Sequence, residues 1–303
     1  MRYQCLYYDQ KKRYLIIMPE LPEVQTVVSE LDRKITGKTI KSVEVRATRS
    51  AQPSPEILIA KTKNKKVKEV KRRGKLIDID LGGDHNILIH LKMTGQLVFV
   101  SRLGKKVSGG HPVGSVGDLP NKFSHVIINF TDGSTLYFND IRKFGWVKYA
   151  TNIERDIARQ RYGLEPFDKE YNLKNFTAIL KRYPKRKIKQ LLMDQEKISG
   201  LGNIYADESL FASHILPTRL ADSLKPKEIE LLFKEIPKIL KLAISKGGTT
   251  ADNYVRTDGS KGQMIKYLKV YSRGGEKCVK CKNEISKIKL GGRGTHFCKT
   301  CQK

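Results

Sequence analysis

The C-terminal segment of the chain carries four cysteines in two Cys-x2-Cys pairs, Cys278 with Cys281 and Cys298 with Cys301. Each pair spans one tight turn, so both thiolates can point at a single ion, and two pairs supply the four ligands of tetrahedral zinc. Four protein ligands leave no open position for substrate, so this ion is expected to hold shape rather than to react. The alternative is four free or disulfide-bonded thiols. The pattern therefore predicts a hairpin held by one structural zinc ion.

The charge balance indicates a polyanionic partner. Lysine and arginine number 59 against 31 aspartates and glutamates, which gives a formal net charge of +28. Such an excess favours nucleic acid, because phosphate neutralisation releases condensed counterions. An anionic membrane surface is a second interpretation. A third is a solvated, lysine-rich surface, since many lysines stand in runs such as 63–68 and 185–189.

Length and apolar patterning limit the kind of protein further. A chain of 303 residues accommodates about two domains beside a small metal module. Cys5 has no partner outside the four paired cysteines, which is typical of a reducing compartment. No apolar stretch reaches the roughly 18 residues of a membrane span, and the one at 14–17 is too short for a signal peptide. We expect a soluble, cytoplasmic protein with no membrane partner.

The hydrophobic period changes along the chain and predicts an α+β, multidomain architecture. Residues 22–35 have helical spacing, whereas residues 39–149 show short alternating segments separated by turn residues, typical of an antiparallel β-sandwich. Helical patterns then recur near 172–182, 187–196, 204–213 and 226–246, and Pro237 predicts a kink or break in the last of them. Residues 101–121 and 247–263 are expected to be loops.

Five further motifs stand in a fixed order with the cysteines. They are residues 18–24 (MPELPEV), 72–75 (RRGK), 90–95 (HLKMTG), 140–145 (DIRKFG) and 200–205 (GLGNIY). Taken singly, each is explained by a helix cap, a turn or packing. Together they resemble the formamidopyrimidine-DNA glycosylase (Fpg) family, bifunctional base-excision repair enzymes that remove oxidised purines and cut the strand at the abasic site. The resemblance runs from residue 18 to the C-terminus.

The resemblance implies a domain organisation and a partner. Residues 19–150 would form the N-terminal catalytic β-sandwich with its flanking helix, and residues 151–265 the helix–two-turn–helix DNA-binding domain. Residues 266–303 would form the zinc-finger β-hairpin, and residues 1–18 an extension absent from the native product. The implied partner is damaged double-stranded DNA, bound by a monomer that associates with the nucleoid.

The resemblance also implies catalytic roles. Pro19 matches the family's nucleophile, whose secondary amine attacks C1′ of the damaged nucleotide and forms a Schiff base, a task that suits an amine. Glu20 matches the general acid/base. Lys75 matches a basic residue near the lesion phosphate, and Arg293 matches the arginine at the hairpin tip that holds flanking phosphates during β,δ-elimination.

Pro19 departs from the family pattern because eighteen residues precede it. An internal proline nitrogen is a tertiary amide and has no lone pair available for attack. We expect Met18 to be the true start of translation, so that its removal frees the Pro19 amine, which would titrate near 8. Cleavage by another protease and an inactive, DNA-binding paralogue are the alternatives.

A third set of residues is implied in DNA binding. An enzyme that extrudes a base must fill the space left in the stack, and Met93, Arg142 and Phe144 match the family's three void-filling residues. Asn203 is expected to cap the helix after the Gly-x-Gly turn and to contact the DNA backbone. Lys185 aligns with a basic residue near the lesion but stands in a run of similar charges.

Two positions leave the lesion preference open. Phe123 stands where the family has a DNA-contacting histidine, so His125 is expected to be a fold residue. Residues 247–263 correspond to the segment that covers the extruded base and differ from familiar members. The expected substrates are 8-oxoguanine and formamidopyrimidines, and the alternative is an oxidised pyrimidine, as in the related endonuclease VIII enzymes.

Overall fold

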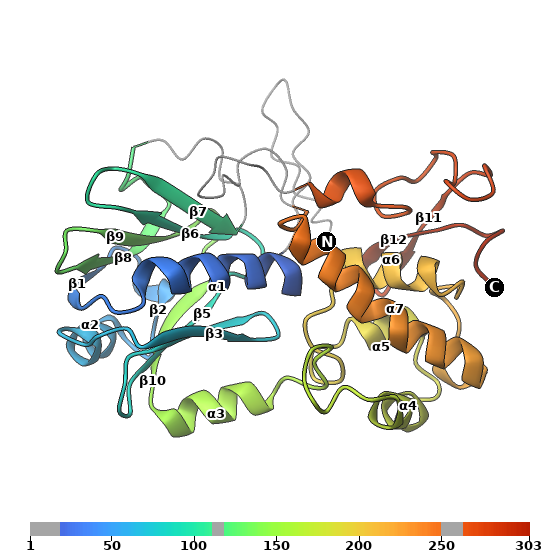
Figure 1. Cartoon of the computed structure of the whole chain (residues 1–303), viewed down its shortest axis with the longest axis horizontal. Coiled ribbons are helices and arrows are strands. Elements are labelled where there is room, and N and C mark those ends of the chain that lie inside the picture. Colours follow the sequence, from blue (N-terminus) through green and yellow to red (C-terminus); the bar gives the residue numbers. More distant parts are fainter. Residues whose placement is uncertain (1–18, 111–117, 250–262) are drawn as a thin grey trace.

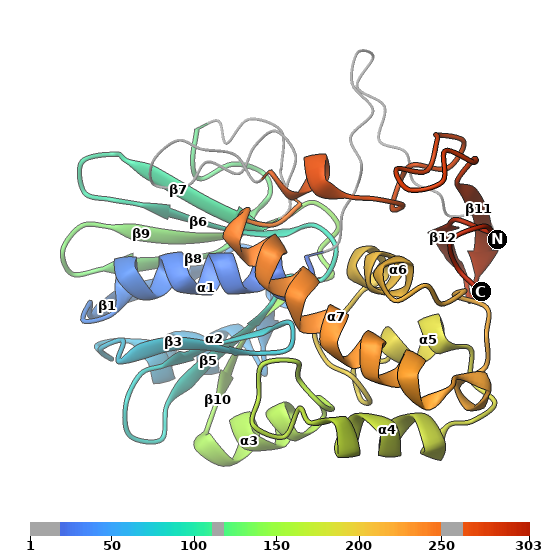
Figure 2. The same ribbon diagram turned by 45° about the vertical axis from the view of Figure 1, so that its right-hand side comes forward.

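The computed structural model describes residues 19–110, 118–249 and 263–303 (Figure 1). The extension 1–18, with Met18, and residues 111–117 and 250–262 of the two expected loops therefore lie outside the described residues. Figures 1 and 2 show a β-sandwich on one side, a group of helices beside it and a small two-stranded hairpin at the far edge of the helices. This arrangement confirms the predicted α+β architecture.

Two five-stranded sheets face each other in the sandwich. The first has the strand order β1 (Ile40–Val45), β8 (Ser124–Phe130), β9 (Thr135–Asp140), β6 (Gly95–Val100), β7 (Lys106–Gly110). The second has the order β2 (Ala51–Gln52), β10 (Trp146–Ala150), β5 (Asn86–His90), β4 (Leu76–Asp80), β3 (Glu69–Arg73). All neighbours are antiparallel except β2 and β10. Strand β7 corrects the expectation that residues 101–121 form only a loop.

Helix α1 (Leu21–Ile35) lies along the open side of the sandwich, against the edge strands β3 and β7 (Figure 1). Its apolar face, which includes Val24, Val28 and Leu31, joins the core between the sheets. Leu21, in the first turn, belongs instead to the core of the helical domain. One helix therefore connects the two cores, and its N-terminal end lies where they meet. A short helix, α2 (Pro55–Thr62), packs on β1 and β2.

The sandwich continues through α3 (Asn152–Gln160) into the helical domain. This domain contains α4 (Leu173–Arg182), α5 (Ile188–Leu192), α6 (Asn203–Ala212) and α7 (Pro226–Ser245), with short 3-10 turns at 221–223 and 264–267. Helix α5 is shorter than predicted, because residues 194–198 turn back and Gln195 bonds the carbonyl of Leu201. Within the described ranges, no helix combines the length and apolar character that crossing a membrane requires.

Of the kink or break expected at Pro237, the break does not occur, because α7 continues through this residue, and the kink stays a prediction. A proline inside a helix leaves the carbonyl four residues earlier without its N–H donor. That carbonyl belongs to Phe233, and the Tyr171 hydroxyl donates to it over 3.1 Å. The aromatic rings of Tyr171 and Phe233 also stack, with a centroid separation of 4.7 Å. Tyr171 therefore supplies the bond that the proline cannot.

The chain ends in a two-stranded hairpin of β11 (Ser286–Leu290) and β12 (Arg293–Phe297). Its strands pair from Ser286 opposite Phe297 to Leu290 opposite Arg293. Gly291 and Gly292 form the turn with φ of 55° and 78°, a conformation that glycine adopts without steric cost. Arg293 therefore lies at the tip of a rigid, closely turned hairpin.

Candidate active site and zinc centre

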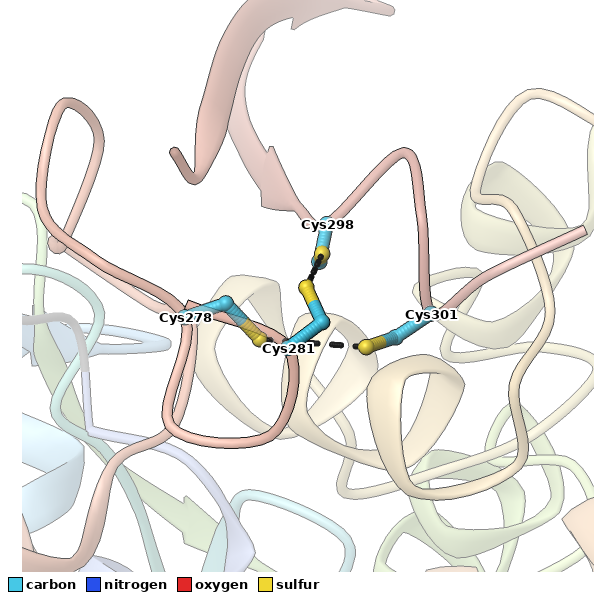
Figure 3. A group of neighbouring side chains, drawn as sticks. All are labelled: Cys278, Cys281, Cys298 and Cys301. Carbon is cyan, nitrogen blue, oxygen red and sulfur yellow. Dashed lines mark hydrogen bonds between the residues drawn. The ribbon is translucent and has the colours of Figure 1, made fainter. Parts of the chain in front are cut away.

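The four cysteine sulfurs converge on one point (Figure 3). All four Sγ atoms lie within 4.8 Å of one another; Cys278 and Cys301 are 3.9 Å apart, and Cys281 and Cys298 are 3.4 Å apart. A tetrahedron with zinc–sulfur bonds of 2.3 Å requires sulfur separations of about 3.8 Å. The geometry and the soft donor set therefore fit zinc, with no ligand position left for substrate.

The first residues of α1 are bound to the beginning of α6. The Glu20 carboxylate accepts hydrogen bonds from the backbone N–H groups of Gly202 (2.7 Å), Ile204 (2.9 Å) and Tyr205 (3.3 Å). The Leu21 N–H donates to the Gly200 carbonyl over 2.9 Å. A carboxylate at a helix N-terminus satisfies donors that the helix leaves free and interacts favourably with its dipole. Pro19 and Glu20, both buried, are thus fixed at the junction of the two domains.

The Gly-x-Gly turn before α6 makes this contact possible. A Cβ at position 202 would lie 2.4 Å from the Glu20 side chain, and one at position 200 would lie 2.5 Å from Leu21. Gly200 also has a φ of 92°, which disfavours any other residue. The two glycines of this turn therefore leave the space that the side chains of Glu20 and Leu21 occupy.

Burial and neighbouring charges shift the pKa values of the ionisable groups at this junction. Burial raises the pKa of Glu20 to about 7, although the cation of Lys75 opposes the shift. Burial lowers the pKa of Lys75, while the nearby charges of Glu20 and Glu23 favour its protonated form and that of Arg293 opposes it. A carboxyl group that titrates near neutral pH can both donate and accept a proton, as general acid/base catalysis requires. Lys75, also buried, stands beside it as a nearly desolvated amine.

Glu23 is a site residue that the sequence analysis did not identify. Its carboxylate accepts from the Glu20 N–H (3.0 Å), the Tyr205 hydroxyl (2.7 Å) and both the N–H (2.8 Å) and the hydroxyl (2.9 Å) of Thr249. The signal available in the sequence was the Glu20-x-x-Glu23 spacing of a capping box. Glu23 therefore ties α1 to α6 and to the end of the helical domain.

The hairpin tip is anchored to α5 and α6 by a buried ion pair. Lys189 lies 2.7 Å from Asp207, and its ammonium also donates to the Thr295 hydroxyl (2.8 Å) and the Gly294 carbonyl (3.2 Å). Asn203 donates to the same carbonyl over 2.9 Å. Sequence analysis missed Lys189 and Asp207, because nothing in their local sequence indicates that they pair. The pair places Arg293, next to Gly294, near Lys75.

Asn203 and Lys185 are the two residues of the helical domain that were predicted to contact DNA. Asn203 does not cap α6: Gly202 occupies the N-cap position, and Glu20 provides the cap from another domain. A DNA contact by Asn203 stays a prediction. Lys185 lies exposed between α4 and α5, and a DNA contact by it also stays a prediction. It is Lys189, four residues later, that reaches the site.

The three residues expected to fill the void lie together. Arg142 donates to the Met93 sulfur over 3.2 Å, and its guanidinium lies 4.6 Å from the centroid of the Phe144 ring. Phe144 is 45% exposed. The buried carboxylate of Asp140 organises both loops by accepting from the Thr94 hydroxyl and from the N–H groups of Arg142 (3.1 Å) and Gly145 (2.7 Å). Insertion into DNA stays a prediction, but the grouping it requires is present.

The histidine next to this group is a fold residue, as expected. His125 is buried, and its Nε2 lies 2.6 Å from the Asp140 carbonyl oxygen. Phe123 is half-buried, with the Lys122 ammonium 5.2 Å from its ring centroid. A cation therefore lies at this position even though the side chain of residue 123 carries no donor.

Comparison with known proteins identifies the chain. The model of the formamidopyrimidine-DNA glycosylase N-terminal domain matches residues 18–147, that of the H2TH domain matches residues 162–254, and that of the zinc finger found in FPG and IleRS matches residues 275–303. This protein belongs to the formamidopyrimidine-DNA glycosylase family. The match assigns this chain to the DNA glycosylases of base-excision repair and confirms the resemblance drawn from its motifs.

Individual relatives agree with the domain matches. Formamidopyrimidine-DNA glycosylases of an Exiguobacterium species and of Streptococcus mutans are each 39% identical, over 94% of this chain and 100% of their own length. The structure of Lactococcus lactis Fpg with abasic-site DNA has a TM-score of 0.83 and 34% identity, over 94% of this chain and 99% of that one. A Lactococcus lactis Fpg mutant with Fapy-dG-containing DNA also has a TM-score of 0.83. The zinc-finger match and the cysteine geometry together confirm the structural zinc.

The protonation of Glu20 has a measurable consequence for stability. In the 303-residue protein, Glu20→Gln should gain stability relative to the parent as the pH rises from about 5 to about 7.5. The folded pKa of Glu20, about 7, exceeds the ordinary value of 4.5. The contribution of protonated Glu20 to the free energy of unfolding is therefore fully present below pH 4.5 and is lost as the pH rises through 7. We expect a relative change of about 2 kcal/mol in urea unfolding. A difference independent of pH would contradict the assignment.

Proposed function

We propose that the chain is a bifunctional DNA glycosylase and abasic-site lyase that removes oxidised purines from duplex DNA. The observation that carries the proposal is the junction where Pro19 and Glu20 are held on the N-terminus of α6, beside Lys75. This places the family's nucleophile position next to a carboxyl group that titrates near pH 7. Structures of Lactococcus lactis relatives with abasic-site and Fapy-dG DNA support DNA as the partner.

In the proposed reaction, the Pro19 nitrogen forms a bond to C1′ as the bond between C1′ and the damaged base breaks. The departing purine takes the proton that the Pro19 nitrogen loses and leaves as the neutral base. Glu20 then donates its proton to the ring oxygen of the sugar, so that the bond between C1′ and this oxygen breaks and an iminium ion forms. Glu20, now a carboxylate, can accept the C2′ proton in the next step. The iminium acidifies the C2′ proton, so the 3′ phosphate and then the 5′ phosphate can be eliminated. Lys75 and Arg293 bind the flanking phosphates.

DNA recognition is proposed for the group on the sandwich and for the hairpin. Met93 and Phe144 would enter the space left by the extruded base, and Arg142 would hydrogen-bond the base opposite it. Lys185 and Asn203 would contact the DNA backbone. The protein would act as a monomer, with residues 19–150 as the catalytic domain, 151–265 as the helix–two-turn–helix domain and 266–303 as the zinc finger.

The reaction requires Pro19 to be the N-terminal residue, since an amide nitrogen cannot attack C1′. We propose that residues 1–18 are absent from the active form. The match to the family begins at residue 18, and relatives matched over their whole length cover 94% of this chain. With Pro19 internal, the second candidate function is lesion binding without chemistry.

The proposal is tested with protein that begins at Pro19. Duplexes with 8-oxoguanine opposite cytosine, with thymine glycol and without damage are incubated with excess enzyme, and base release and strand cleavage are followed over time. We expect release of 8-oxoguanine with cleavage on both sides of the lesion. Faster release of thymine glycol would assign an oxidised-pyrimidine enzyme. Binding to the 8-oxoguanine duplex with release of neither base would support the non-catalytic candidate.

A further inference from the structure

The turn between β3 and β4, which leads directly into Lys75, is clamped to the segment that follows α3. Glu165 is almost fully buried, and one of its carboxylate oxygens accepts from the Arg72 guanidinium while the other accepts from the Gly74 N–H over 2.7 Å. Arg73 lies 3.7 Å from the second oxygen and donates to the Gly163 carbonyl over 2.8 Å. One carboxylate from the helical side therefore holds three consecutive residues of the sandwich.

The turn packs closely against Tyr162 and Ser199. Gly74 has a φ of 56°, and a Cβ there would lie 2.6 Å from the Tyr162 ring and 3.3 Å from Ser199. Ser199 directly precedes Gly200, whose carbonyl accepts from the Leu21 N–H in the seat of Glu20. The turn therefore contacts the same backbone segment that binds the beginning of α1, next to Pro19 and Glu20. A shift of the turn would change the separation between Lys75 and Glu20.

We propose that Glu165 is a positioning residue that fixes Lys75 in the active site by holding the Arg72–Gly74 turn. The inference rests on the proposed function, since it assumes that Lys75 acts in excision. The Lys75 ammonium stands at the end of four rotatable bonds, so its position depends on the position of the Lys75 backbone. Glu165 fixes that backbone through the adjacent Gly74 N–H, and Arg72 holds the carboxylate in place.

The arrangement requires the charge as well as the shape of Glu165. Both partners of the Arg72 pair are buried, with side-chain exposures of 7% and 5%. Replacing one partner leaves a buried charge without compensation, which is strongly unfavourable. A glutamine could still accept from the Gly74 N–H, but its amide would present N–H donors or a neutral oxygen to two guanidinium groups. We therefore expect Glu165→Gln to release the turn while preserving side-chain volume.

The test is a double-mutant cycle between Glu165→Gln and Lys75→Met, in protein beginning at Pro19. Single-turnover release of 8-oxoguanine is measured under saturating enzyme. We expect Glu165→Gln to slow release roughly 10- to 100-fold, because misplacement by about 1 Å costs on that order. In the Lys75→Met background the same substitution should change the rate by no more than about twofold, since the group it positions is gone. A purely structural role would slow release equally in both backgrounds and would overturn the proposal.

Asp168, which pairs with Arg73 of the same turn, provides a matched control. Asp168 pairs with Arg73 at a position where its side chain is 40% exposed, and Arg73 keeps its bonds to the carbonyls of residues 162 and 163 without it. Asp168→Asn should leave the rate within about twofold of the parent, because exposed ion pairs contribute little. An equal loss in Asp168→Asn and Glu165→Gln would also overturn the proposal.

A second variant keeps the proposal testable if Glu165→Gln does not fold. Gly74→Ala displaces the same turn without altering a charge, and it should likewise slow release in the parent but not in Lys75→Met. Circular dichroism and affinity for undamaged DNA verify folding for each variant. If parent protein beginning at Pro19 releases no base, the proposed function and this inference both fail. If the parent is active and the cycle is additive, only the inference fails.

Discussion

Protein that begins at Pro19 is expected to form a covalent adduct with an 8-oxoguanine duplex under borohydride, whereas the 303-residue protein forms none. Borohydride reduces an iminium to a stable amine, so it records the attack of a neutral nitrogen on C1′. In the longer protein the Pro19 nitrogen is an amide and cannot attack. The ordinary pKa of a terminal amine lies near 8, and an amine with that pKa is partly neutral at physiological pH. The expected difference is nearly all-or-none.

The control is protein that begins at Met18, in which Pro19 is internal by a single residue. It differs from the active form by almost nothing in mass or fold, and it should give no adduct at Pro19. Peptide mass analysis then locates the modified residue. An adduct of equal yield from the 303-residue protein, or one located on a lysine, would show that Pro19 is not the nucleophile.

The second large effect concerns the zinc site. Cys298→Ser should bind zinc poorly and lose DNA affinity by about tenfold or more, while the β-sandwich stays folded. Cys298 and Cys278 form a small core with Phe211 and Val270, separate from the core of the sandwich. Without zinc the hairpin keeps the Lys189–Asp207 anchor but loses the second constraint on the position of Arg293. A charged contact to phosphate contributes about 1.5–3 kcal/mol.

Val279→Ala is the matched control, since Val279 lies 41% exposed between the first two ligands and supplies none. Zinc content is measured by metal analysis, affinity by titration of an abasic-site analogue duplex, and sandwich folding by the thermal transition of the sheets. Parent-like affinity in zinc-free Cys298→Ser would show that the hairpin contributes nothing to binding. Loss of the sheet transition would show that zinc supports the whole molecule.

Parts of the fold follow directly from local sequence. Two-residue spacing brings Cys278 and Cys281 to one ion whatever surrounds them, and the period of α1 places its apolar face without reference to the sheets. The strand at 106–110 was missed because its lysine and glycine residues are typical of a loop, although it pairs with the neighbouring strand β6. That α7 does not break at Pro237 was missed because it depends on a distant partner. For α7 that partner is the Tyr171 hydroxyl, 62 positions from the carbonyl it satisfies.

Site residues divide in the same way. Pro19, Glu20 and Lys75 could be named as candidates because each stands in a motif whose order along the chain identifies the family, and Arg293 because it lies between the two cysteine pairs. Their roles in the reaction stay predictions. Glu165, Lys189 and Asp207 could not be named, since a glutamate or a lysine in an ordinary helix or turn is usually a solvated surface residue. Only burial beside a specific partner from another segment distinguishes them. Glu23 stands in the first motif and has the spacing of a capping box, but its bonds to Tyr205 and Thr249 do not follow from that spacing.

The sequence by itself determined the metal ligands and the order of the domains' motifs, because those properties depend on residue type and spacing. It also indicated the Pro19 amine as the nucleophile that we propose. Tertiary structure alone decided the environment of that amine. Glu20 and Gly202 are 182 positions apart, yet their contact places a carboxyl group on a helix N-terminus in a buried junction. Burial and the opposing cation of Lys75 together set the pKa of Glu20, and neither can be deduced from the residues that flank it in the chain.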